Sequence, residues 1–193
     1  MAKKSEIKKQ YITEQAEKVF REKGYSAVTM SDIVEACEIS RGGLYLYFSN
    51  VDEVFLGVLK NRDMQLDTTG LDMDGSKSFK QLTEIFFGLQ KQKLLGSNRG
   101  LLQALFEYYL MHRESDDKNY YIKQFFGTKY LLIKILKYGA DKGKIKKKEI
   151  SNLAHTILFV LSGMETMSLS GSITEDIIEN QFAHFKKIIS ASK

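Results

Sequence analysis

The chain lacks proline altogether and has one cysteine, Cys37. Without proline, long helices can run without a residue that removes a backbone hydrogen bond, and the abundant Leu, Lys, Glu, Ile and Gln are good helix formers. A lone cysteine excludes an internal disulfide and favours a reducing compartment. No apolar run approaches the ~18 residues of a membrane span. We therefore expect an all-α protein in the cytoplasm, with no membrane partner.

The sequence also lacks the signatures of common enzymes and cofactor sites. It has no glycine-rich phosphate loop, no nucleophile elbow and no paired-acid motif. The three histidines, His112, His155 and His184, have no partner at metal-ligand spacing. Cys37 has no second cysteine nearby, which favours a small buried side chain over a redox switch. We expect no enzymatic activity, no cofactor and no metal.

The distribution of positive charge along the chain is more informative than the net charge. The formal net charge is +5, but residues 1–60 contain nine Lys or Arg and nine Asp or Glu. Because this segment has no net charge, any attraction to a nucleic acid must come from the positions of individual basic side chains. The candidates are Lys3, Lys4, Lys8 and Lys9 near the N-terminus, and Arg41. The densest basic run, at residues 142–148, is compatible with a second nucleic-acid contact, although a solvated loop is the simpler interpretation.

The first sixty residues have the pattern of three short packed helices. Residues 5–23 show apolar positions at helical spacing and end before Gly24, a typical C-cap. Thr29 and Asp32 form a capping-box pair that predicts a second helix. Ser40 can cap a third helix, with Leu44 and Phe48 facing inward. Two helices joined by a tight turn are how a helix-turn-helix meets DNA, although an ordinary three-helix corner remains an alternative.

The remaining chain is predicted to be a larger helical domain. Asn50 and Glu53 form a cap pattern before a connecting helix at about 51–67, followed by a loop at 68–78. Further helices are predicted near 79–95, 100–113, 117–138, 148–168 and 174–190, separated by Gly, Ser, Asn and Asp. We thus expect a helix-turn-helix domain at residues 1–50 and a larger helical domain at 51–193, and the family resemblance described next implies DNA binding for the first and effector binding and dimerisation for the second.

The helix-turn-helix residues resemble the DNA-binding domain of the TetR family of bacterial transcriptional regulators. The resemblance covers roughly residues 12–59 and is tightest at 39–48, Ile-Ser-Arg-Gly-Gly-Leu-Tyr-Leu-Tyr-Phe, followed by Asn50, Asp52 and Glu53. Upstream, residues 20–25 and Thr29 also match. The resemblance implies that the third helix enters the major groove of double-stranded DNA.

The resemblance implies roles for seven residues at this interface. Ser40, Arg41 and Gly43 match positions facing bases or adjacent phosphates, and Arg41 can make a bidentate contact to guanine. Tyr45, Tyr47 and Thr29 match phosphate contacts. Gly42 and Gly43 together weaken the helix by ~1 kcal/mol each relative to Ala, which we interpret as allowing close approach of the backbone to DNA.

Three positions depart from the family pattern. Glu38 stands where the turn usually has glycine, so either it adopts a positive φ at a cost of roughly 1 kcal/mol or the turn differs. Val51 replaces a usual basic residue, which predicts one fewer phosphate contact. Leu46 stands where an aromatic residue or histidine is common.

The resemblance also implies a cavity for a small effector in the larger domain, largely apolar or aromatic. Most apolar side chains there are core by default. The candidates for lining the cavity are Met64, Phe86, Phe87, Leu102, Phe106, Tyr109, Phe126 and Tyr130.

The last two helices carry apolar stripes that could pair across a two-fold axis as a four-helix bundle. The candidates are Leu153, Ile157, Leu161, Met164, Ile178, Phe182, Phe185 and Ile189. The alternative is that these stripes pack into the core of their own subunit.

By analogy with the family that it resembles, we expect a homodimeric, ligand-responsive repressor that leaves a near-palindromic operator when an effector binds, with the connecting helix as the lever. One alternative is a constitutive helix-turn-helix factor without induction. Another is a ligand-binding or interaction protein whose first domain no longer reads DNA, which the neutral charge, Glu38 and Val51 would suit.

Overall fold

The computed structural model describes residues 2–66, 71, 73–95, 98–112 and 119–192, and within these ranges it is built of helices with no β-strand. The helices match the predicted ones closely, and none of those described is long and apolar enough to cross a membrane. Part of the predicted loop at 68–78 and the predicted breaks at 96–97 and 115–116 lie outside the described residues. The helices are α1 (Ala2–Lys23), α2 (Met30–Cys37), α3 (Arg41–Tyr45), α4 (Val51–Leu66), α5 (Phe79–Leu94), α6 (Asn98–Met111), α7 (Asn119–Asp141), the 3₁₀ turn η2 (Lys147–Glu149), α8 (Ile150–Leu169) and α9 (Glu175–Ala191).

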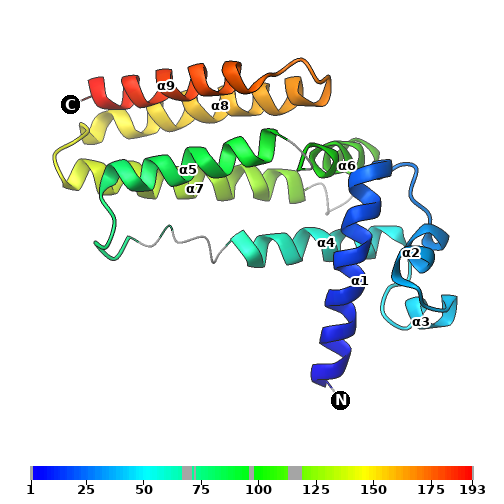
Figure 1. Cartoon of the computed structure of the whole chain (residues 1–193). Helices are drawn as coiled ribbons and strands as arrows, with labels where there is room; N and C mark the ends of the chain where they lie inside the picture. The colour runs from blue at the N-terminus through cyan, green and yellow to red at the C-terminus, as the bar shows by residue number, and fades with distance from the viewer. Residues whose placement is uncertain (1, 67–70, 72, 96–97, 113–118, 193) are drawn as a thin grey trace. The chain divides into compact units, whose positions relative to one another are not determined.

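Backbone contacts divide the chain into two compact units. Figure 1 shows the chain coloured by residue number from the N-terminus to the C-terminus. The first, which we call the reading unit, consists of residues 1–70 and 100–111, so it contains α1 to α4 and nearly all of α6. The second, the body unit, consists of residues 71–99 and 112–193. The functional boundary predicted at residue 50 stays a prediction.

Side-chain caps begin several helices where the sequence predicted them. The Thr29 hydroxyl accepts a hydrogen bond from the Asp32 amide, completing a capping box with the Asp32 carboxylate. Ser40 caps α3 through the Gly43 amide, and Asn50 accepts from the Glu53 amide at 2.8 Å at the start of α4. These caps satisfy amides that have no partner inside their own helix.

An aromatic cluster forms the centre of the reading unit. Phe20 of α1 lies edge-on to Phe55 of α4, with ring centroids 4.7 Å apart. Tyr25, from the turn after α1, lies 5.1 Å from Phe55 and 5.0 Å from Tyr108 of α6. Such pairs contribute about 0.5–1.5 kcal/mol each beyond their burial. The cluster therefore joins α1, α4 and α6 although they are distant in sequence.

Polar contacts also attach α6 to the turn between α1 and α2. The Glu107 carboxylate accepts hydrogen bonds from the amides of Tyr25, at 2.8 Å, and Ser26, at 2.9 Å. Partial burial opposes ionisation of Glu107, but these bonds and one from Gln103 outweigh it and lower its pKa. A Cβ at Gly100 would lie 2.0 Å from the Arg21 carbonyl oxygen, so only glycine allows α6 to approach α1 this closely.

The body unit packs α5, α7, α8 and α9 around one core, in which the pair α8 and α9 lies over α5 and α7 (Figure 1). Phe87 of α5 is central, with its ring centroid 4.9 Å from that of Phe182 and 5.8 Å from that of Phe185 on α9. Ion pairs from α5 close the edges, including Lys91 with Glu175 at 2.7 Å and Lys93 with Glu165 at 2.5 Å.

Candidate nucleic-acid interface

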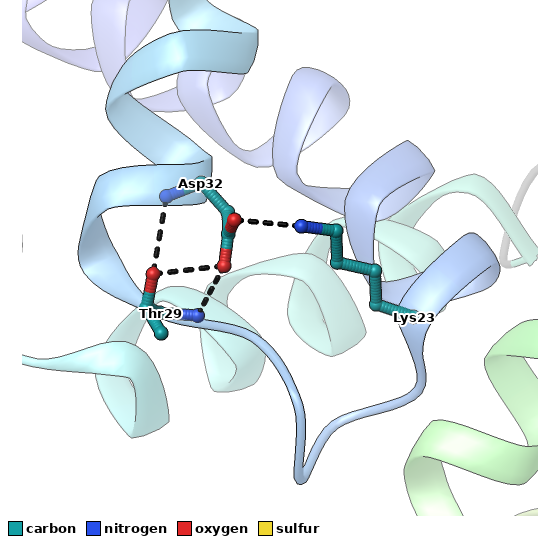
Figure 2. Close-up of polar contacts among 3 residues, drawn as sticks. All are labelled: Lys23, Thr29 and Asp32. Atoms are coloured by element: carbon teal, nitrogen blue, oxygen red, sulfur yellow. Dashed lines mark hydrogen bonds and ion pairs between the residues drawn. The ribbon is translucent and has the colours of Figure 1, made fainter.

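The start of α2 is held by a compact set of charged and polar contacts, shown in Figure 2. The Asp32 carboxylate accepts hydrogen bonds from the amide and hydroxyl of Thr29, both at 2.8 Å. Its other oxygen pairs with the Lys23 ammonium group at 2.7 Å. The carboxylate lies at the positive end of the helix, where an anion is stabilised.

This arrangement gives Thr29 a capping role in addition to the predicted phosphate contact. The hydrogen bond from Lys23 and those from Thr29 lower the pKa of Asp32 to about 2. A carboxylate of the protein itself therefore already occupies part of the anion site at this helix end, and Lys23 offsets its charge. Thr29 remains exposed, but its hydroxyl is engaged in the cap, so a phosphate contact at this point stays a prediction.

The turn between α2 and α3 passes through Glu38 in the left-handed conformation, with φ 51° and ψ 44°. Among the described residues outside glycine, Glu38 alone has a positive φ. The first of the two alternatives from the sequence is therefore correct: Glu38 accepts the strained conformation. The turn keeps the usual geometry without the usual glycine, at a cost of about 1–2 kcal/mol.

In the segment that contains the short helix α3, most of the predicted residues are exposed and the core residues are buried. Leu44 is fully buried, and Phe48, just beyond the helix, is nearly so. Ser40, Arg41 and Gly42 are exposed. Tyr45 is 53% exposed, and Tyr47 is partly exposed. The side chains predicted to contact DNA thus lie at the surface of one segment, where a ligand can reach them.

The two glycines of α3 differ in what surrounds them. A Cβ at Gly43 would lie 3.2 Å from the Ser40 hydroxyl oxygen, so a side chain there would crowd the cap. A Cβ at Gly42 would meet nothing within 4 Å. Internal packing therefore does not require glycine at position 42, although glycine weakens a helix by ~1 kcal/mol relative to Ala.

Two residues of this surface were not predicted from the sequence. Leu46 follows α3 and is 81% exposed. Its position between Tyr45 and Tyr47, both predicted to contact DNA, could have indicated from the sequence that it lies on this surface. Ser31 of α2 accepts a hydrogen bond from the Arg41 guanidinium at 3.0 Å, and this contact between two helices had no local signal. Arg41 is thus anchored by one exposed hydrogen bond.

Cys37 closes α2 as a buried side chain with 1% exposure. Burial raises the pKa of its thiol, so the reactive thiolate is disfavoured. The Tyr11 hydroxyl donates to the Cys37 carbonyl at 3.2 Å, which ties α1 to the turn. Within the described residues, no group of three or more His, Cys, Asp and Glu side chains is arranged to hold a metal ion.

Comparison with known proteins places this interface in a family. Residues 12–58 match the model of bacterial regulatory proteins of the tetR family. This segment, which forms α2, α3 and their flanking residues, is what the chain shares with that family. It is 44% identical over 61 residues to the uncharacterised helix-turn-helix regulator YfiR of Bacillus subtilis, and 30% identical over 93 residues to YuxN of the same organism. These matches span 32% and 45% of this chain but only 26% and 32% of the relatives.

Solved structures of low sequence identity share the whole fold. FadR of Bacillus halodurans, a fatty acid degradation regulator, is 18% identical with a TM-score of 0.71, and 94% of each chain is covered. MexZ of Pseudomonas aeruginosa, a repressor responsible for antibiotic resistance, is 18% identical with a TM-score of 0.70, covering 95% of this chain and 94% of MexZ. The predicted fold class, an N-terminal helix-turn-helix domain with a larger helical domain, is confirmed.

The residues predicted to line an effector cavity are divided between the two units. Phe86 and Phe87 are buried in the body core, whereas Phe126 and Tyr130 of the same unit are 55% and 66% exposed. Leu102, Phe106 and Tyr109 belong to the reading unit through α6, and the side chain of Met64 lies outside the described residues. The cavity stays a prediction that these positions alone do not define.

The stripes predicted for the dimer interface are already occupied by the protein's own core. Every one of the eight side chains is at most 8% exposed, so none of them presents its surface to a partner. All of them belong to the core of their own unit, and their part in a dimer interface stays a prediction: Leu153, Ile157, Leu161, Met164, Ile178, Phe182, Phe185 and Ile189. The large exposed apolar side chains of these helices are Phe159, Val160 and Met167 of α8 and Ile177 of α9.

The Asp32 contacts make the free energy of unfolding depend on pH in the acid range. Because the pKa of Asp32 falls from 3.8 to about 2 on folding, its stabilising contribution is complete above about pH 4 and is lost as the pH falls to about 2. We expect Asp32→Asn to flatten this part of the stability profile, measured by urea unfolding at a series of pH values. Glu6→Gln, which removes an exposed carboxylate of the same unit, is the control; an equal flattening by both variants would contradict the assignment.

The strain at Glu38 predicts that glycine is stabilising there. Glu38→Gly should raise the free energy of unfolding by about 0.5–1 kcal/mol, because relief of the left-handed conformation exceeds the added entropy of the unfolded chain. Glu38→Gln removes the same charge but keeps the strain, so it should leave stability nearly unchanged. Urea midpoints of the two variants test this, and equal gains would show that charge rather than backbone strain is responsible.

Proposed function

We propose that this TetR-family protein is a homodimeric transcriptional repressor that binds a near-palindromic DNA operator through α3 and is released by a small-molecule effector. The observation that carries the proposal is the surface of α3, where an uncrowded glycine stands beside an exposed arginine and two accessible tyrosines. Gly42 lowers the helix propensity of α3, and packing inside the protein does not require it. A glycine at such a position allows the backbone to make close contact with a partner.

The chemistry of the surface suits a duplex groove. The guanidinium group of Arg41 fits the O6 and N7 acceptors of guanine, and it can leave Ser31 at little cost because their hydrogen bond is exposed. The hydroxyls of Tyr45 and Tyr47 suit phosphate oxygens, which position the protein without reading sequence. Leu46 is suited to a thymine methyl group.

Dimerisation is proposed to use the outward face of α8 with part of α9. The exposed positions of α8 include Thr156, Phe159, Val160, Gly163 and Met167, and none of these carries a charge. Phe159 is 67% exposed and Met167 51%. An uncharged face with large exposed apolar side chains is typical of a permanent interface, and a two-fold axis would give two copies of α3 a fixed separation.

Effector control is supported by the way the chain crosses between its units. It passes between them near residues 70, 99 and 111, so α4 precedes the first crossing and nearly all of α6 lies between the other two. An effector, largely apolar or aromatic, that favours an arrangement unable to bind DNA by ~1–3 kcal/mol would lower operator affinity about 5- to 150-fold. FadR, a fatty acid degradation regulator, and MexZ, a repressor, have this fold and support a regulatory role.

A constitutive DNA-binding factor is the second candidate. Phe86 and Phe87, two of the residues predicted to line the cavity, are packed inside the body core. Because they fill space that an effector would need, this packing favours a factor without an effector. An effector that leaves operator affinity unchanged after its binding has been verified by calorimetry would select this candidate.

Operator recognition is testable by fluorescence-anisotropy titration against duplex DNA from the region upstream of the protein's own gene and a scrambled duplex, at physiological salt. We expect preference for the native duplex and a loss of roughly 5- to 150-fold with Arg41→Ala, the equivalent of about 1–3 kcal/mol at one bidentate contact. Gly42→Ala sharpens the test, because it should stabilise α3 by up to ~1 kcal/mol and still weaken operator binding. Equal, weak binding of both duplexes by the wild type, repeated with duplexes from unbiased selection, would contradict recognition.

Dimerisation is testable by sedimentation equilibrium. Phe159→Lys places a charge on each side of the proposed two-fold interface, and we expect it to shift the protein to monomer while the helical signal is retained. Tyr130→Lys changes an equally exposed aromatic residue on α7 and should leave the dimer intact. A monomeric wild-type protein, or a dimer unaffected by Phe159→Lys, would exclude this interface.

A further inference from the structure

The positive charge of this protein is concentrated away from its helix-turn-helix. The reading unit has ten basic and twelve acidic residues, a formal net charge of −2, whereas the body unit has nineteen and twelve, a net charge of +7. Residues 119–150, which comprise α7, the segment after it and η2, contain nine lysines and two acids. This one segment therefore accounts for the whole excess of the body unit.

The lysines of α7 share the face that points away from the core. Leu132, Ile135 and Leu136 are buried. At about 100° per residue, Lys123, Lys134 and Lys137 lie within an arc of about 60° on the opposite side, spread over about 21 Å of helix. All three are exposed. We call this surface, together with the exposed Lys142, Lys144, Lys146 and Lys148 that follow it, the lysine face.

The segment after α7 is held in place. The amide of Lys144 donates to the Gly139 carbonyl at 2.8 Å, and the amide of Lys146 donates to the Ser192 carbonyl at 2.8 Å. Between them Ile145 is 5% exposed and belongs to the body core. These lysines therefore extend the charge of α7 at fixed positions.

Among the described residues, the lysine face lacks neutralising carboxylate partners. In the described part of the chain, Lys147 pairs with Asp141 at 3.1 Å, but no ion pair joins a carboxylate to a lysine of the lysine face. Like charges at this density repel one another, and an extended anion with closely spaced charges relieves that repulsion and releases its own counterions on binding.

The exposed aromatic rings of α7 favour a nucleic acid over a membrane or an acidic helix. The ammonium group of Lys134 lies over the ring of Tyr130, 5.4 Å from its centroid, and that of Lys129 lies 5.8 Å from the centroid of Phe126. Rings covered by lysines are poorly placed to enter lipid or an apolar groove, but a surface of lysines with interleaved aromatic rings suits phosphates and bases.

We propose that the lysine face is a second nucleic-acid-binding surface, which holds the phosphate backbone without reading sequence. It would supply the attraction that the reading unit, with its net charge of −2, does not. The proposal rests on the proposed function only in taking DNA as the ligand, because binding to the lysine face needs neither an operator nor α3.

The test uses a scrambled 30-base-pair duplex and the full-length protein, with affinity measured from 50 to 200 mM salt. Lys134→Gln with Lys137→Gln removes two charges of the lysine face and preserves helix propensity. We expect weaker binding at 50 mM salt and a logarithmic salt slope shallower by about 1–2, since each phosphate contact contributes about 0.9. Lys80→Gln with Lys187→Gln removes two exposed lysines elsewhere in the body unit and should change the slope far less.

The outcomes separate this proposal from operator recognition. If Arg41→Ala abolishes the preference for the native duplex and leaves the slope on scrambled DNA unchanged, while the lysine-face variant does the reverse, both proposals hold. An unchanged slope in the lysine-face variant, or equal changes in both lysine pairs, would overturn the inference whatever Arg41→Ala does. Loss of binding to phosphatidylserine vesicles with DNA binding unchanged would overturn it in favour of a lipid surface.

Discussion

The packing of α6 against the turn between α1 and α2 is the constraint on which the reading unit depends. Tyr25 lies between Phe55 and Tyr108, and the amides of Tyr25 and Ser26 donate to Glu107. The turn leads directly into the cap of α2, so the orientation of the helix-turn-helix depends on a helix about eighty residues later in the chain. Burial and a hydrogen bond to Asp52 also raise the pKa of Tyr25, which keeps its hydroxyl protonated as a donor.

Local chemistry explains which features could be predicted from the sequence. The caps at Thr29, Ser40 and Asn50 involve residues three apart, so their pattern is visible in the chain itself. The backbone conformation at Glu38 could be narrowed to two alternatives, because a helix-turn-helix restricts the geometry of the turn. The contact between Gly100 and Arg21 could not be found, since its partners are distant in sequence and α6 has an ordinary helical pattern.

The apolar stripes of α8 and α9 show a second limit. Ile157 and Phe182 have the spacing of an interface, but the same spacing describes a helix that packs on its own core. Only the packing of α5 and α7 decides between them. The informative residue was Phe159, a large aromatic side chain outside the stripe and exposed on a helix with almost no charge. An apolar residue that breaks the core periodicity is therefore better evidence for a partner than one that obeys it.

The division of charge gives the two units different physical tasks. A reading unit with a net charge of −2 gains little from long-range attraction, so its affinity must come from short contacts that depend on fit. Glu38, in the turn before α3, adds an exposed negative charge, which penalises any approach in which those contacts are imperfect. A lysine face elsewhere then raises the residence of the protein on DNA without relaxing that discrimination. Sequence preference and overall affinity can in this way be set by different residues of one chain.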